Sequence, residues 1–243
     1  MLDILQYGLY YTRLEATAAP LWSLLLVALA AYLLGSVNSA VLVSRLLYRT
    51  DIRTQGSGNA GLTNMFRVYG KRAALFTLLG DILKTVLSVL LTAIVFGFWY
   101  SHALSVNYFC YIAALFCVIG HIKPIYYGFR GGKGVLCTAV AVLLLAPAVF
   151  GILFIAFVLI VWATRYISLG SIVTAGLLPL TLQAYMQIIM GDDTYNPMIV
   201  LLGFLFAVIV VVCHRANIGR LWRHEENKFS FHRKKADGED EKK

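Results

Sequence analysis

Residues 135–163 read VLCTAVAVLLLAPAVFGILFIAFVLIVWA and contain no charged side chain. This run exceeds the roughly 20 apolar residues that one membrane-spanning helix needs. Pro147 and Gly151 interrupt it near its middle, so it predicts either one long tilted helix or a hairpin of two short helices. The choice decides the topology of the whole chain, because every later segment changes side of the membrane with it.

The composition of the chain is that of a membrane protein. Of its 243 residues, 60% are hydrophobic and 14% are charged, and the mean hydropathy is +0.76. Soluble domains are about half apolar and about one quarter charged, which excludes both a water-soluble globular protein and a disordered chain. Other apolar runs predict further spans at residues 21–47, 74–98, 104–120, 172–190 and 198–213.

The distribution of basic residues favours the hairpin. Loop 44–72 carries six Lys or Arg against one Asp, loop 121–134 carries three bases and no acid, and link 191–197 carries two Asp and no base. Basic loops stay on the cytoplasmic side, and only a double crossing of residues 135–163 puts every basic segment there. The sequence therefore predicts an all-α polytopic integral membrane protein with about seven transmembrane helices, its N-terminus outside and its C-terminus in the cytoplasm.

Three regions follow from this topology. We expect an N-terminal interfacial segment at residues 1–20, a membrane domain at residues 21–213 with cytoplasmic motif loops, and a basic cytoplasmic tail at residues 214–243. The bases of the tail suit the anionic headgroups of a lipid bilayer.

The first polar loop has the residues of a phosphate site. Gly56, Gly58 and Gly61 permit positive φ, and successive exposed amides in such a loop form an anion-binding nest. Short polar side chains accompany them, together with arginines that pair bidentately with phosphate; these residues are Arg53, Ser57, Asn59, Thr63, Asn64 and Arg67. A polar turn whose arginines only set the topology is the alternative.

The second polar loop ends in Gly131-Gly132-Lys133-Gly134, ahead of a predicted helix. Free amides, a positive helix end and a lysine suit a phosphate group. The spacing is not that of a Walker A loop, so an ATPase is not expected. A flexible basic loop is the alternative, but two such loops on one membrane face favour a phosphate site.

Further polar residues lie in or beside the spans. Asp81 and Lys84 are one helical turn apart in an apolar run, where they either neutralise each other or are functional. Ser168 and Ser171 share a helix face, and His214 and Asn217 lie where the last span ends. The chain has no G-x-S-x-G, H-E-x-x-H or C-x-x-C motif, so neither a metal nor another cofactor is expected.

Together these segments resemble the bacterial acylphosphate-dependent glycerol-3-phosphate acyltransferases, the PlsY family. The resemblance covers nearly the whole chain after Leu34 and is carried by GSVNS (35–39), GSGNAGLTNMFR (56–67), Asp81 with Lys84, GHIKPIYYGFRGGKGV (120–135), RYISLGS (165–171), HRANIGRL (214–221), and Glu226 with Lys228-Phe229 in the tail. The chain departs from the family pattern at Asn38, Leu62, Thr85, Lys123, Arg130 and Cys137, none of which is a proposed catalytic group.

The resemblance implies a seven-span enzyme of the bacterial inner membrane whose active site faces the cytoplasm. It implies transfer of a fatty acyl group from acyl phosphate to the sn-1 hydroxyl of glycerol 3-phosphate, giving lysophosphatidic acid and phosphate in the first step of phospholipid biosynthesis. The catalytic residues carried over are Ser57, Arg67, Lys133, His214 and Asn217. Those assigned to substrate or phosphate binding are Arg53, Asn59, Asn64, Lys84, Gly131, Gly132, Ser168 and Ser171.

The chemistry is consistent with these residues. Acyl phosphate is a mixed anhydride with a good leaving group, so positioning and electrostatic stabilisation supply most of the acceleration. We expect Lys133 and the glycine amides to bind one phosphate and Arg67 with Ser57 the other, while His214 and Asn217 orient the acceptor. The base is either His214 or a phosphate oxygen of the substrate, and the sequence does not choose between them.

The main alternative is an organic-phosphate transporter that uses the basic loops as a vestibule. All polar loops fall on one side, however, and no two spans show the matched broken helices of many transporters. We expect a monomer that binds acyl phosphate, glycerol 3-phosphate and the bilayer, and no nucleic acid.

Overall fold

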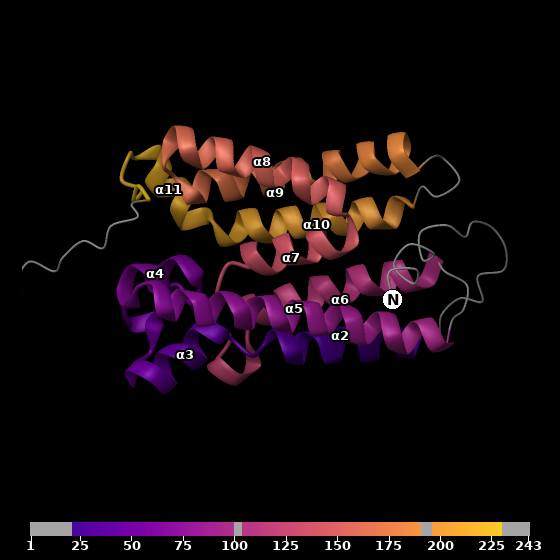
Figure 1. The fold of residues 1–243 in the computed structure, drawn as a ribbon, viewed down its shortest axis with the longest axis horizontal. Helices are drawn as coiled ribbons and strands as arrows, with labels where there is room; N and C mark the ends of the chain where they lie inside the picture. Colours follow the sequence, from indigo (N-terminus) through magenta and orange to yellow (C-terminus); the bar gives the residue numbers. More distant parts are fainter. Residues whose placement is uncertain (1–20, 100–103, 191–195, 230–243) are drawn as a thin grey trace, which may run out of the picture.

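The computed structural model describes residues 21–99, 104–190 and 196–229, and this part of the chain contains helices and no strand. The long helices lie side by side along one axis (Figure 1). In chain order the elements are α2 (Leu21–Gly35), α3 (Ser39–Tyr48), η1 (Ile52–Thr54), α4 (Leu62–Tyr69), α5 (Lys71–Trp99), α6 (Leu104–Ile122), η2 (Ile125–Tyr127), α7 (Val135–Leu145), α8 (Pro147–Thr164), α9 (Ile167–Ala184), η3 (Tyr185–Met190), α10 (Pro197–Cys213) and α11 (Arg215–Trp222). The expected interfacial segment 1–20 and the last part of the expected tail lie outside the described residues.

The all-helical membrane architecture is confirmed. Five helical segments of the described chain are long and apolar enough to cross a membrane, and a sixth is added if α10 and α11, bent by 58°, form one span. α7 is also apolar but has 11 residues, which at about 1.5 Å per residue is roughly half of a bilayer core. The count of seven crossings and their orientation therefore remain predictions.

The predicted break within residues 135–163 is present. α7 ends at Leu145, Ala146 leaves the helical conformation, and Pro147 is the first residue of α8. Proline fits this position because the first residues of a helix need no N–H donor. α7 packs against α5, α6 and α8, whereas α8 exposes large apolar side chains, which suits a helix that faces lipid.

The expected span at residues 21–47 agrees with a candidate span at Trp22–Tyr48, but two helices, α2 and α3, make it up. The chain leaves the helix after Gly35 and re-enters it at Ser39, because Asn38 caps α3 by accepting a hydrogen bond from the Val41 amide at 3.0 Å. The expected span 172–190 begins earlier, at Ile167, and ends in the π-helical turn η3.

Close packing of α2 on α6 fixes the position of the break between α2 and α3. A Cβ on Gly35 would lie 2.1 Å from the Cys117 carbonyl oxygen, and one on Gly120 would lie 2.3 Å from that of Tyr32. Only glycine permits this approach of two helix backbones. The main hydrophobic core fills the bundle, and a smaller apolar cluster supports the first polar loop; its buried members are Ala40, Val41, Ile52, Ala60, Met65 and Ala73.

Candidate active site

The polar segments predicted to form the site gather at one end of the bundle. Figure 1 shows α3, α4 and α11 together at this end, on the left. Hydrogen bonds join the segments there: Arg53 of the first loop contacts the second loop, and Lys133 of the second loop contacts Asn217 of α11. The tertiary structure therefore joins all three groups of predicted residues.

Asn64 organises the first loop from inside. It is 1% exposed, its Oδ1 accepts from the Ser57 amide at 2.9 Å, and its Nδ2 donates to the carbonyls of Gln55 and Asn59, both at 3.0 Å. These bonds occupy the polar atoms of Asn64 and leave the Ser57 side chain exposed. In the described structure Asn64 therefore shapes the loop, while the side chains of Ser57 and Arg67 are exposed, and their expected contact with a ligand remains a prediction.

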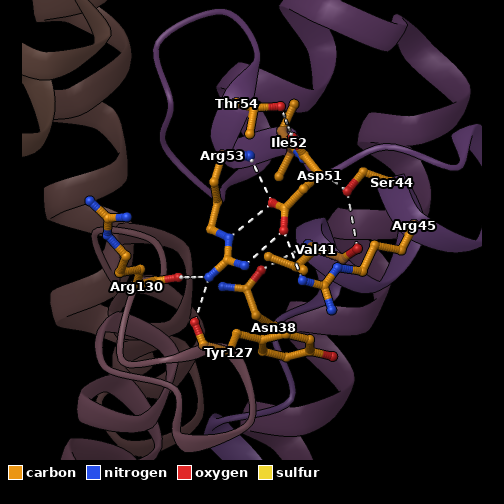
Figure 2. Close-up of polar contacts among 10 residues, drawn as sticks. All are labelled: Asn38, Val41, Ser44, Arg45, Asp51, Ile52, Arg53, Thr54, Tyr127 and Arg130. Atoms are coloured by element: carbon orange, nitrogen blue, oxygen red, sulfur yellow. Dashed lines mark hydrogen bonds and ion pairs between the residues drawn. The ribbon is translucent and has the colours of Figure 1, made fainter.

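Arg53 joins the two glycine-rich loops (Figure 2). Its Nε and one terminal nitrogen donate to the two oxygens of Asp51 at 2.9 and 2.7 Å, and its other terminal nitrogen donates to the carbonyls of Tyr127 and Arg130. Hydrogen bonding from Arg53 holds the pKa of the Asp51 carboxyl well below its usual range. Four guanidinium contacts are thus used within the protein, and the expected phosphate contact of Arg53 remains a prediction.

The amides of Gly131 and Gly132 differ from the expected phosphate cradle. The Gly131 amide donates to the Ile122 carbonyl and the Gly132 amide to the His121 carbonyl, both at 3.1 Å. Both donors are therefore engaged within the protein. In the described chain the next two amides, of Lys133 and Gly134, donate to no other group, and they precede the first turn of α7. The free donors thus lie one to two residues later than expected.

Lys133 lies at the centre of the site. Its ammonium donates to Asn217 Oδ1, and Asn217 Nδ2 donates to Glu226 Oε1 at 2.7 Å. Burial lowers the pKa of Lys133 to about 8, and the nearby Arg67 and Arg220 act in the same direction while Glu226 opposes them. The lysine is therefore charged at neutral pH and becomes neutral as the pH rises through about 8.

Glu226 is a site residue that the sequence analysis used only as part of the family resemblance. Its carboxylate accepts hydrogen bonds from Asn217, from Ser168 Oγ at 2.9 Å and from Arg220 Nε at 2.7 Å. Burial opposes ionisation, but these hydrogen bonds lower the pKa of Glu226 overall. The sequence signal was an acid following the basic α11, but its partners come from two helices, α9 and α11.

His214 and Ser171 are buried beside these groups. His214 Nδ1 lies 2.7 Å from the Val210 carbonyl oxygen, which only accepts, so this nitrogen carries the proton. Nε2 of the neutral ring consequently has a free lone pair. Ser171 Oγ donates to the Ile167 carbonyl in its own helix at 2.9 Å.

Lys84 has a different environment from the one expected of a phosphate ligand. It is 5% exposed, and its Nζ has four acceptors within the protein: Asp81 Oδ1, His121 Nδ1 and the carbonyls of Gly35 and Val37. An ammonium has three N–H donors, so none is left for a substrate. Its expected direct contact with phosphate is not supported by this geometry.

Comparisons with known proteins identify the relatives of this chain. A family model described as glycerol-3-phosphate acyltransferase matches residues 25–224. The glycerol-3-phosphate acyltransferase of Syntrophomonas wolfei is 42% identical over 199 residues, covering 82% of this chain and 93% of the relative. That of Thioalkalivibrio sulfidiphilus is 45% identical over 202 residues, covering 82% and 91%.

Two crystal structures are also similar. They are of PlsY, an integral membrane glycerol 3-phosphate acyltransferase, in a glycerol 3-phosphate form (TM-score 0.70, 27% identity) and in a lysophosphatidic acid form (TM-score 0.69, 25% identity). Each alignment covers 86% of this chain and 96% of the other. The predicted family is confirmed: the chain belongs to the glycerol-3-phosphate acyltransferases of the PlsY type.

Proposed function

We propose that this chain transfers a fatty acyl group from acyl phosphate to the sn-1 hydroxyl of glycerol 3-phosphate. The products are lysophosphatidic acid and inorganic phosphate, and the reaction is the first step of phospholipid biosynthesis at the cytoplasmic face of the bacterial inner membrane. Membership of the family supports the acyl transfer, and the two ligand forms of the PlsY relative support the acceptor and the product. We further propose that the monomer is the active unit.

The main structural support for this proposal is the contact of Lys133 with Asn217. It joins the second loop to α11 beside two free backbone amides and the N-terminal end of α7. An ammonium, amide donors and a positive helix end together suit one phosphate group. In this arrangement the amides of Lys133 and Gly134 replace those of Gly131 and Gly132 as donors.

The first loop supplies the second phosphate site. Arg67 is exposed and close enough to Lys133 to act on its pKa, and Ser57 is held exposed by the bonds of Asn64. Glycerol 3-phosphate is a phosphate ester and acyl phosphate is a mixed anhydride, and their negative charges repel each other. A reaction between them therefore needs positive side chains that point to the same place. Arg67 and Lys133, on different loops, meet this requirement by electrostatic stabilisation of two anions.

The chemical step needs no covalent intermediate on the protein. The sn-1 hydroxyl oxygen attacks the acyl carbonyl carbon, the bond from that carbon to the phosphate oxygen breaks, and the hydroxyl proton leaves to His214 or to a phosphate oxygen. The free lone pair of His214 Nε2 suits a hydrogen bond from the hydroxyl. Asn217, held by Glu226, orients Lys133 toward the same point.

The test uses the purified full-length protein in detergent or lipid. Glycerol 3-phosphate is added with palmitoyl phosphate, and phosphate release is followed; a parallel reaction contains palmitoyl-CoA, and both contain EDTA. We expect release that depends on glycerol 3-phosphate, with the CoA reaction silent. Absence of turnover from a folded sample, or turnover with palmitoyl-CoA alone, would overturn the proposed donor, and uptake of organic phosphate into vesicles would then support the transporter.

A further inference from the structure

A buried polar cluster that the proposed reaction does not use lies where α5 and α6 meet. Asp81 and Lys84 come from α5 and His121 from the end of α6, and they are 1%, 5% and 4% exposed. Lys84 Nζ lies 2.8 Å from Asp81 Oδ1 and 2.9 Å from His121 Nδ1. A buried ion pair often adds no stability over apolar residues of similar volume, so stability alone does not explain this cluster.

The cluster also holds the break between α2 and α3. Lys84 Nζ donates to the carbonyls of Gly35 at 3.2 Å and Val37 at 3.1 Å, and Ser39 Oγ donates to Asp81 Oδ1 at 2.9 Å. A cation at the end of α2 is favourable for the unpaired carbonyls and the helix dipole. The ion pair is thus fixed from α2, α3, α5 and α6 together.

These contacts fix the proton position of His121. The ammonium of Lys84 only donates, so His121 Nδ1 is the acceptor of their 2.9 Å hydrogen bond. Asp81 Oδ1 is 3.6 Å from the same nitrogen, beyond a good hydrogen bond. The neutral ring therefore carries its proton on Nε2, the nitrogen on the side of the second loop.

The second loop packs directly against His121. A Cβ on Gly132 would lie 2.1 Å from His121 Nε2, and one on Gly131 would lie 2.1 Å from the His121 carbonyl oxygen. The Gly132 amide donates to that same carbonyl. The position of Lys133, the next residue, consequently depends on where the ring and backbone of His121 are held.

A metal ion is the competing explanation for part of this cluster. Asp81, His121 and Cys137 have ligand atoms within 4.8 Å of one another, the one such group in the described part of the chain. Two of the three already bind the Lys84 ammonium. A divalent cation would have to displace a fixed positive charge, so the lysine itself serves as the cation.

We propose that Asp81, Lys84 and His121 are positioning residues that set the place of Lys133. Lys84 fixes the His121 ring through Nδ1, and the ring and carbonyl of His121 fix Gly131 and Gly132, so that Lys133 and its free amide face the phosphate. The inference deepens the proposed function and rests on it. It changes the expected role of Lys84 from a phosphate ligand to a residue that acts through His121.

The main test is the double variant Asp81→Asn/Lys84→Met, which removes both charges and leaves no unpaired buried ion. In this variant we expect hydrogen exchange at the peptide covering Gly131 and Gly132 to become about tenfold faster, since their amide bonds loosen. We expect the KM of one substrate to rise about tenfold with kcat changed less than about threefold. The substrate affected is the one whose KM also responds to Lys133→Met.

A second variant separates the loop contact from the ion pair. His121→Asn retains an acceptor for Lys84 but lacks the second ring nitrogen beside Gly132, so we expect the same rise in KM and in loop exchange with α5 unchanged. The matched control is Thr92→Val, a buried α5 residue two turns from Lys84, for which both readouts stay at the wild-type values.

Two outcomes would overturn the inference. One is a folded double variant whose loop exchange and KM values equal those of the wild type. The other is faster exchange spread through α5 and α6 as well as the loop, which means a general packing role. If the wild type shows no turnover, the proposed function fails, whereas the exchange comparison still decides whether the cluster positions the loop.

Discussion

Lys133 makes the reaction sensitive to alkaline pH. Its pKa is lowered to about 8 by burial, so the free enzyme loses this positive charge as the pH rises through about 8. We therefore expect kcat/KM to fall over that range, because the phosphate loses its cationic partner. Lys133→Arg keeps its charge at all accessible pH values and should remove this fall. Initial rates from pH 6 to pH 10 provide the measurement, and an identical alkaline limb in the arginine variant would contradict the assignment.

His214 separates the two possible bases. If a phosphate oxygen takes the proton, His214 only orients the hydroxyl, and we expect His214→Ala to raise the KM of glycerol 3-phosphate with kcat reduced less than about tenfold. The buried Nδ1 contact with Val210 explains why the ring is held in one orientation. Steady-state kinetics of the purified variant check this, and a kcat loss on the order of 10³ would instead identify His214 as the general base.

At the scale of elements, Arg53 couples η1 to the loop around η2. Asp51 holds one side of its guanidinium, while the carbonyls of Tyr127 and Arg130 bind the other (Figure 2). We expect Arg53→Gln to cost about 1–3 kcal/mol through the lost charged hydrogen bonds and to speed hydrogen exchange around Tyr127. Arg45→Gln is the control for stability, because Arg45 is 52% exposed, makes a single bond to Asp51 and otherwise only lies over the Tyr127 ring. Equal effects of the two variants on the thermal midpoint would refute the coupling.

At the scale of the whole molecule, whether α7 and α8 cross the membrane separately decides the sidedness of the chain. With two crossings of residues 135–163, residue 194 lies outside and Arg72 lies in the cytoplasm. In a Cys213→Ala background, we expect a membrane-impermeant maleimide to label Thr194→Cys in intact cells and Arg72→Cys only after permeabilisation. Labelling of Thr194→Cys only after permeabilisation would mean a single crossing and would place the basic tail outside.

The sequence by itself determined the membrane class, the family and most helices. Apolar runs longer than a bilayer, basic loops and the glycine-rich stretches are local patterns, and the energy of placing them in lipid or water depends little on distant residues. The break at Pro147 is of the same kind, because a proline acts on its own helix. The motif residues Ser57, Lys133 and Asn217 were likewise visible along the chain.

Only the tertiary structure decided which groups hydrogen-bond to each buried polar side chain. The bonds of Lys84 to the break between α2 and α3, the bond of Glu226 with Ser168 and that of Lys133 with Asn217 join segments 47 to 84 residues apart. The Gly131 and Gly132 amides bind carbonyls nearer in sequence, but the close packing of their loop on His121 decides those partners. Lys84 has the same local pattern whether it binds phosphate or Asp81 and His121, so only the fold reveals its partners. The physical reason is that a buried donor or acceptor must be satisfied, and the group that satisfies it is chosen by which helices pack together.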